Sequence, residues 1–233
     1  MPAQNEAKTI VTVLTQLQQY PEFDVLVVND ASSDNTAKLA QQAGATVISL
    51  FESLGAWGAI QTGLRYAQQQ HYHLVITMDA DGQHRVESLT ALQQVVTQQQ
   101  AAVAIGSCIQ RGSASRHLAW QLFRRLSGLK VEDLTSGLRA YNKAAIDLLA
   151  SSRATLLDYQ DMGVLLLLRQ AGLKTKDIPV MMSERQQGKS RIFNSWWRVL
   201  LYMLQTLVLI LANTNQQDIW QKKSKINSKS QDE

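Results

Sequence analysis

Two aspartates lie two residues apart, directly after an apolar run at residues 74–78. Asp79 and Asp81 precede Gly82, which can turn the chain, so both carboxylates can converge on one side. Paired carboxylates of this kind hold a hard divalent cation, Mg²⁺ or Mn²⁺, and leave coordination sites open for a diphosphate. Gln83 could add a neutral oxygen ligand. The alternative is that Asp-Ala-Asp-Gly is only a polar turn after a strand.

A second acidic loop follows the apolar run at residues 25–29. The carboxylate of Asp30 could accept hydrogen bonds from a nucleobase and from ribose hydroxyls. The alternative role is helix capping, but residues 33–35 already supply cap candidates for the next helix, and capping is the role we expect for Asp34. Glu6, near the start, either favours the positive end of a helix or faces a nucleoside.

These loops need a scaffold that brings them together. Short apolar runs alternate with helical patterns from residue 25 onward, which is typical of βα units in a mostly parallel sheet. We expect strands at residues 25–29, 46–50, 74–78, 103–106 and 178–182. We expect helices at residues 6–19, 35–43, 56–70, 86–99, 114–126 and 158–171. Ligands of open parallel sheets bind beyond the carboxyl ends of the strands, where both acidic loops fall.

Length and composition limit the classes of protein. A chain of 233 residues with 45% hydrophobic content fits one α/β domain followed by a tail. The net charge of +4 is small and dispersed, so we expect no nucleic-acid partner. The single cysteine, Cys108, excludes an intramolecular disulfide and fits a reducing compartment.

Five segments, in this order, resemble the family-2 glycosyltransferases of the dolichyl- and polyprenyl-phosphate mannose synthase type. They are PAQNEA, VVNDASSDNT, TMDADGQH, DLTSGLRAYN and RQQGKSR, between residues 2 and 191. The resemblance implies a GT-A fold, which is a Rossmann-like, mostly parallel sheet flanked by helices. It also implies a nucleotide diphosphate sugar as donor, Mg²⁺ or Mn²⁺ as cofactor, and inversion of the anomeric centre.

The resemblance also implies roles for residues at matching positions. The nucleoside pocket would be lined by Pro2, Glu6 and Asp30. The metal would be met by Asp79, Asp81 and Gln83. Arg139 would meet phosphate, which suits a planar and permanently charged guanidinium; the alternative is a surface arginine on a strand. We expect Asp81 and Arg139 to be the catalytic residues.

Further basic residues are candidates for acceptor binding. Arg116 resembles a second phosphate ligand, although a solvated or lipid-facing role is equally expected for its helix. The loop at residues 185–191 resembles the family's flexible acceptor loop, with Arg185, Lys189 and Arg191 as contacts to an anionic acceptor. A polyprenyl phosphate is already an anionic nucleophile, so the site needs positioning and charge neutralisation more than a strong base. For a hydroxyl acceptor, Asp158 and Asp161 are candidate bases, but a helix-end role is expected for both.

The sequence departs from the family pattern in two respects. The family has an aromatic residue where Gln4 stands and an acid where Asn29 stands, so the base and sugar of the donor are not predicted. Relatives also carry an apolar strand immediately before the proline that corresponds to Pro2. We therefore expect the chain as it begins at Met1 to fold poorly, and an upstream apolar strand to rescue it.

An apolar stretch at residues 199–212 follows Trp196 and Trp197 and precedes several lysines. Spanning a bilayer takes about 20 apolar residues, whereas shorter runs more often lie at the interface or in a core. Basic residues on both sides place both ends in the cytoplasm, and the tryptophans and lysines favour an interfacial helix. The alternative is a core helix or one that forms a homo-oligomer.

We therefore expect three segments: a GT-A glycosyltransferase domain at residues 1–191 with its first strand missing, an interfacial or membrane helix at 192–213, and a polar lysine-containing tail at 214–233. The expected function is metal-dependent, inverting transfer of a hexose from a nucleotide diphosphate sugar to polyprenyl phosphate, at the cytoplasmic face of a membrane. One alternative acceptor is a saccharide or lipid hydroxyl. The other alternative is an inactive, truncated relative that acts as a membrane-bound interaction protein.

Overall fold

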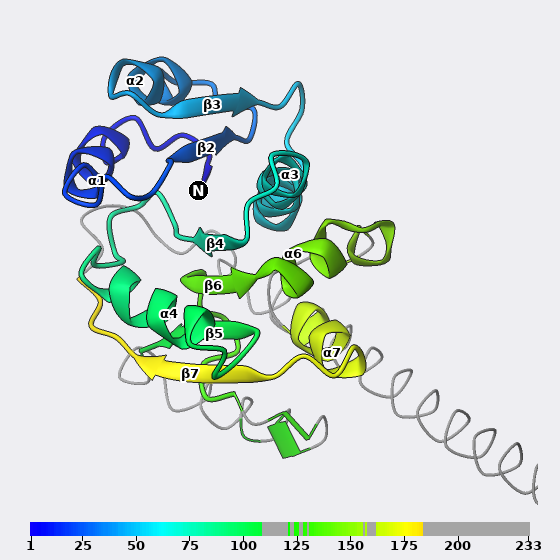
Figure 1. The fold of residues 1–233 in the computed structure, drawn as a ribbon. Coiled ribbons are helices and arrows are strands. Elements are labelled where there is room, and N and C mark those ends of the chain that lie inside the picture. The colour runs from blue at the N-terminus through cyan, green and yellow to red at the C-terminus, as the bar shows by residue number, and fades with distance from the viewer. Residues whose placement is uncertain are drawn as a thin grey trace, which may run out of the picture. The chain divides into compact units, whose positions relative to one another are not determined.

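The computed structural model describes most of one compact unit and part of a second (Figure 1). The first unit comprises residues 1–113 and 131–188, and the second comprises residues 114–130 and 189–233. The described residues are 1–108, 121, 124, 125, 128, 129, 131–155, 157 and 162–183. The expected helix at residues 192–213 and the lysine tail lie outside them. Within the described ranges, no helix combines the length and the apolar character that crossing a membrane requires.

Three parallel strands form the first sheet, in the order β1-β2-β3. They are β1 (Pro2–Ala3), β2 (Leu26–Asn29) and β3 (Thr46–Ser49). β3 pairs with β2 along its whole length, whereas β1 pairs only with Val28 and Asn29. The connecting helices are α1 (Ile10–Leu17) and α2 (Thr36–Gln42). α1 buries one face at helical spacing, namely Ile10, Val13, Leu14 and Leu17.

Four strands form the second sheet, in the order β4-β6-β5-β7. They are β4 (Leu74–Thr77), β5 (Val103–Ser107), β6 (Arg139–Asn142) and β7 (Thr175–Pro179). β6 runs antiparallel to both of its neighbours, whereas β5 and β7 are parallel. The start of β6 at Arg139 therefore lies beside the end of β4 at Thr77. This register brings a loop from the second half of the chain to the aspartate pair.

Four further helices lie in the described part of the chain, and one of them shares the core cluster with both sheets. They are α3 (Gly55–Gln69), α4 (Ser88–Thr97), α6 (Lys143–Ala150) and α7 (Met162–Gln170), with a short 3₁₀ helix η1 (Ser152–Ala154). The core cluster includes Val27 of β2, Leu92 of α4 and Ala104 of β5, so it draws on both sheets. The mostly parallel α/β architecture expected from the sequence is confirmed.

The elements lie near their expected positions, with three differences. The last strand was expected at residues 178–182 but is Thr175–Pro179, because it pairs with β5 although its first residues are polar or charged. The first helix begins at Ile10 and not at Glu6, whose carbonyl accepts hydrogen bonds in the preceding turn. β1, β6 and α6 were not among the expected elements, although one alternative placed Arg139 on a strand. Of the helix expected at 114–126, the structure describes only residues 121, 124 and 125, all helical.

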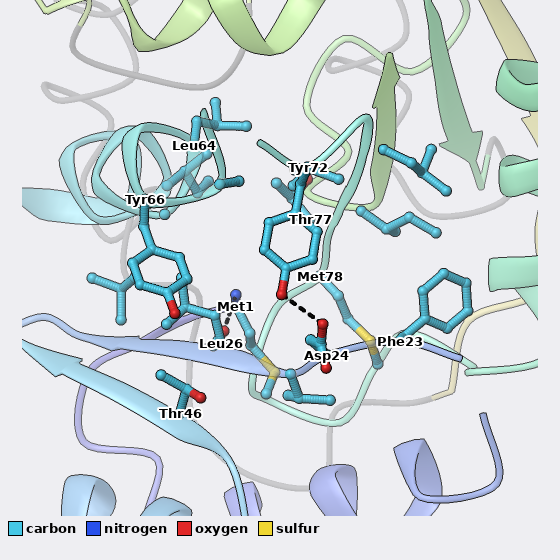
Figure 2. A pocket seen from close by; sticks show the side chains of 18 of the residues that line it. Met1, Phe23, Asp24, Leu26, Thr46, Leu64, Tyr66, Tyr72, Thr77 and Met78 are labelled. Atoms are coloured by element: carbon cyan, nitrogen blue, oxygen red, sulfur yellow. Dashed lines mark hydrogen bonds between the residues drawn. The ribbon is translucent and has the colours of Figure 1, made fainter. Parts of the chain in front are cut away.

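An apolar cavity of about 420 Å³ lies between β2, β4 and α3 (Figure 2). No pairing joins β2 to β4 in the described part of the chain. The amine of Met1 donates to the carbonyl of Leu26 at 2.8 Å, and burial lowers the pKa of this amine to about 6. The expectation of an additional apolar strand before Pro2 stays a prediction.

Candidate active site

Loops from both sheets meet at the carboxyl end of β4. Thr9, just before α1, donates its hydroxyl hydrogen to the carbonyl of Ala80 at 2.9 Å, which ties the first sheet's loops to the aspartate loop. Thr77, the last residue of β4, donates to the carbonyl of Gly137 at 2.8 Å. Met182, just beyond β7, forms an isolated bridge with His84. Three distant parts of the chain therefore surround residues 79–84.

The aspartate pair lies in a tight turn. Oδ1 of Asp81 accepts a hydrogen bond from the N–H of Gln83 at 3.1 Å, and Gly82 has a φ of +76°, which a residue with a Cβ rarely adopts. The side chain of Asp79 is 46% exposed, whereas Gln83 is only 4% exposed. The Asp79 side chain is thus partly exposed to solvent, and metal binding by the Gln83 side chain stays a prediction.

The donor atoms of this loop fit a hard cation held partly by substrate. In the described ranges, no three His, Cys, Asp or Glu residues gather closely enough to hold a metal ion. Metal binding by Asp79 and Asp81 stays a prediction, in which water and a diphosphate would supply the remaining ligands. Mg²⁺ is commonly bound in this way, through one or two carboxylates plus substrate phosphates.

The Asp79 carboxylate is held from two sides. Nε2 of His84 lies 3.1 Å from its Oδ2. On the other side, a Cβ added to Gly137 would lie 2.6 Å from Oδ2 and 2.7 Å from Oδ1, so the carboxylate occupies the space that a side chain at this position would need. Neither Gly137 nor His84 was among the site residues predicted from the sequence.

Asp30 binds groups of its own protein. This residue is 3% exposed, and its carboxylate accepts hydrogen bonds from the N–H of Leu54 at 2.7 Å and of Gly55 at 3.1 Å. The hydroxyl of Ser53 adds a third bond at 2.8 Å. Asp30 therefore caps the start of α3, a helix distant in sequence. Its expected contact with the nucleoside stays a prediction.

The neighbouring Asp34 has the capping role expected of it. Its Oδ1 accepts a hydrogen bond at 2.9 Å from the N–H of Thr36, the first residue of α2, and its Oδ2 accepts one from the N–H of Ala7. Burial alone would raise the pKa of this carboxyl, but the hydrogen bonds from Thr36 and Ala7 outweigh it and lower the pKa.

The other expected nucleoside residues lie beside these loops. Pro2 is in β1, paired with Val28, and the N–H of Glu6 donates to the hydroxyl of Thr36 at 2.8 Å. Sequence reasoning assigned no contact to Gln4, whose amide donates to the carbonyl of Asp30 and to the hydroxyl of Ser53, both at 3.0 Å. A signal that could have indicated such contacts is the presence of polar residues directly after strands.

Arg139 is fully buried, so the alternative of a surface arginine is wrong. Its Nε donates to the carbonyl of Ser136 and its Nη2 to the carbonyl of Leu134, both at 3.0 Å. Nη1 has no hydrogen-bond partner among the described residues. The guanidinium thus fixes the loop that brings Gly137 against Asp79. Contact with a substrate phosphate stays a prediction.

The expected acceptor residues lie outside the described residues. They are Arg116, Arg185, Lys189 and Arg191, together with the candidate bases Asp158 and Asp161.

Comparison with known proteins places this geometry in context. Residues 1–148 match the family described as "Glycosyl transferase family 2". An undecaprenyl-phosphate mannosyltransferase of Micrococcus luteus is 30% identical over 211 residues, covering 82% of this chain and 85% of the relative. A polyprenol monophosphomannose synthase of Mycolicibacterium smegmatis is 25% identical over 213 residues, covering 84% and 80%.

Solved structures share the fold at lower identity. Glucosyl-3-phosphoglycerate synthase of Mycobacterium tuberculosis, solved with Mn²⁺, uridine-diphosphate-glucose and phosphoglyceric acid, superposes with a TM-score of 0.66 at 18% identity. The match covers 91% of this chain and 77% of that one.

Proposed function

The chain belongs to glycosyl transferase family 2, and from this premise we propose that it transfers a hexose from a nucleotide diphosphate sugar to a polyprenyl phosphate. It is a glycosyltransferase by family. The names of the relatives from Micrococcus luteus and Mycolicibacterium smegmatis support the acceptor class. The proposal includes a divalent metal and inversion of the anomeric centre.

The observation that carries the proposal is the aspartate pair at the carboxyl end of β4. The Asp79 side chain is partly exposed, and its carboxylate lies between His84 and Gly137. Asp81 lies in the same turn. A bound Mg²⁺ or Mn²⁺ would supply charge neutralisation for the diphosphate leaving group. The two carboxylates would hold that ion. The hydrogen bond from Thr9 to the carbonyl of Ala80 would hold the loop before α1 beside the metal-binding turn. The hydrogen bond from Gln4 to the carbonyl of Asp30 would hold the two loops of the expected nucleoside pocket together.

The acceptor explains why the described site needs no strong base. A polyprenyl phosphate oxygen is anionic at neutral pH, so it can attack the anomeric carbon once it is positioned on the face opposite the diphosphate. The basic residues Arg116, Arg185, Lys189 and Arg191 would then neutralise the acceptor phosphate. We also propose that residues 192–213 bind the cytoplasmic membrane surface, where this acceptor resides.

A lipid-labelling experiment tests the proposal. Vesicles containing undecaprenyl phosphate are incubated with the protein, Mn²⁺ and a panel of labelled nucleotide diphosphate sugars. We expect label from one sugar to enter the butanol-soluble lipid, and excess EDTA to prevent it. Replacing undecaprenyl phosphate by undecaprenol separates a phosphate acceptor from a hydroxyl acceptor. Equal labelling of undecaprenol would contradict the proposed acceptor, and absence of labelling with every donor would favour an inactive relative.

A further inference from the structure

We propose that His84 is a positioning residue, which holds the Asp79 carboxylate in the orientation needed to bind a divalent cation. The inference rests on the proposed metal-dependent function and assigns to His84 a role beyond shaping the loop. The proposed role is limited to orienting the Asp79 carboxylate of this chain. His84 itself is not offered as a metal ligand.

The first support is the contrast in exposure between the two partners. The Asp79 side chain is 46% exposed, whereas the His84 side chain is only 2% exposed. Their contact, 3.1 Å from Nε2 to Oδ2, therefore joins a solvent-facing carboxylate to a group fixed inside the protein. Side chains that bind metal ions are commonly oriented by such hydrogen bonds from behind.

The second support is that the backbone around His84 is itself fixed. His84 forms a bridge with Met182, and the carbonyl of Gln83 accepts a hydrogen bond from the N–H of Ser183 at 2.9 Å. Both partners follow β7, so the backbone that carries the imidazole is anchored to the second sheet and not only to its own turn. A donor held in this way restricts the rotation of the carboxylate that it contacts.

The third support is that Gly137 closes the opposite side of the carboxylate. Because a Cβ at this position would lie 2.6 and 2.7 Å from the two oxygens of Asp79, only glycine leaves room for the observed orientation. The carbonyl of Gly137 is held by Thr77 at 2.8 Å. The Asp79 carboxylate thus lies between the His84 imidazole on one side and Gly137 on the other.

The hydrogen-bond pattern also indicates which nitrogen carries the proton. Nδ1 of His84 is buried and has no hydrogen-bond partner within the described part of the chain. A proton on Nδ1 alone would leave a buried N–H without an acceptor and would set the Nε2 lone pair against Oδ2. A proton on Nε2 avoids both costs, so Nε2 is the nitrogen that donates to Asp79.

Direct metal binding by the intact protein tests the role of His84. The probe is Mn²⁺, and unbound Mn²⁺ is measured by electron paramagnetic resonance in the presence of a nucleoside diphosphate. We expect His84→Ala to raise the Mn²⁺ dissociation constant about 10- to 100-fold, the usual cost of losing such a partner. His84→Gln should recover part of the affinity because its amide can donate to Oδ2. The exposed His73→Gln is the matched control and should bind Mn²⁺ like the unchanged protein.

A second variant approaches the carboxylate from the other side. Gly137→Ala should weaken Mn²⁺ binding as His84→Ala does, because the added methyl displaces the carboxylate. Gly63→Ala, where the nearest side-chain atom would be 3.6 Å away, is its control. Thermal unfolding in EDTA gives the metal-free stability of each variant, so that a general loss of fold is recognised.

The outcomes separate the inference from the proposed function. If the unchanged protein binds Mn²⁺ and folded His84→Ala and His84→Gln bind it equally well, the positioning role is wrong. The same holds if Gln recovers no affinity and the losses only follow the unfolding temperature in EDTA. If the unchanged protein binds no Mn²⁺ even with a nucleoside diphosphate, the proposed metal dependence itself fails.

Discussion

The carboxylate of Asp30 accepts a hydrogen bond at 3.1 Å from the backbone N–H of Gly55, the residue at which α3 begins. The N–H of Leu54 and the hydroxyl of Ser53 bind the same carboxylate. A residue at the end of β2 therefore fixes the entry of a helix that leads to β4. This connection links the expected nucleoside side of the site to the strand that carries the aspartate pair.

Replacing Asp30 should cost stability as well as nucleotide binding. We expect Asp30→Ala to lower the free energy of unfolding by about 2 kcal/mol, because it removes a helix cap and leaves backbone N–H groups without their acceptor. Urea unfolding measures the change. Asp34→Ala, at an exposed cap of α2, is the control and should cost about 1 kcal/mol or less. An equal or smaller loss for Asp30→Ala would contradict this stabilising role.

Replacing Asp81 should affect activity and not stability. Asp81→Asn keeps an oxygen that can accept the N–H of Gln83, so the turn is retained, but an amide cannot neutralise a cation. We expect transfer to fall about 100-fold or more, since metal charge stabilisation is worth several kcal/mol. Initial rates of lipid labelling measure the activity, and urea unfolding checks that stability is unchanged. Full turnover of the unchanged protein in excess EDTA would show that no metal is needed.

Filling the cavity between β2 and β4 should stabilise the protein. An apolar, β-branched extension of four residues placed ahead of Met1 would continue β1 past the start of β2, toward the cavity and the edge of β4 that has no strand partner in the described part of the chain. We expect a gain of about 1.5–3 kcal/mol for each side chain that it fully buries, measured by urea unfolding. The buried amine of Met1 would also be replaced by a neutral peptide group.

An extension of equal length in which alternate residues are proline is the control, because proline cannot donate to a strand. Equal stabilisation by both extensions would indicate simple apolar filling and not strand pairing. If the chain that begins at Met1 unfolds cooperatively and binds nucleotide as well as the extended one, the expectation of poor folding without such a strand is wrong.

Asp177 should make stability fall as pH rises. Burial raises the pKa of this carboxyl from an ordinary value of 3.8 to about 6, so between these values the folded state holds more protons than the unfolded state. The free energy of unfolding therefore decreases across this range as the carboxyl ionises. We expect Asp177→Asn to remove this contribution and to reduce the stability difference between pH 4.5 and pH 7, measured by urea unfolding. An unchanged difference would contradict the raised pKa.

The sequence alone determined the features that depend on neighbouring residues. The apolar run before Asp79 predicted a strand, and the Asp-Ala-Asp-Gly turn predicted carboxylates at its end, because alternating apolar runs and turn residues act over a few positions. The same reasoning located β2, β3 and β5 within one or two residues. The family resemblance rested on such short segments and was confirmed by the match of residues 1–148.

The tertiary structure alone decided how distant residues hold those carboxylates. The short run at Arg139–Asn142 begins with a charged residue, so no local pattern marked it as a central antiparallel strand. Without β6, nothing in the sequence could place Gly137 against Asp79, or enclose the guanidinium of Arg139. Asp30 likewise bonds to residues 23 to 25 positions away, once a whole α-β connection has folded back. Such contacts depend on strand order and register, which are set by packing of the entire core and not by the residues that form the site.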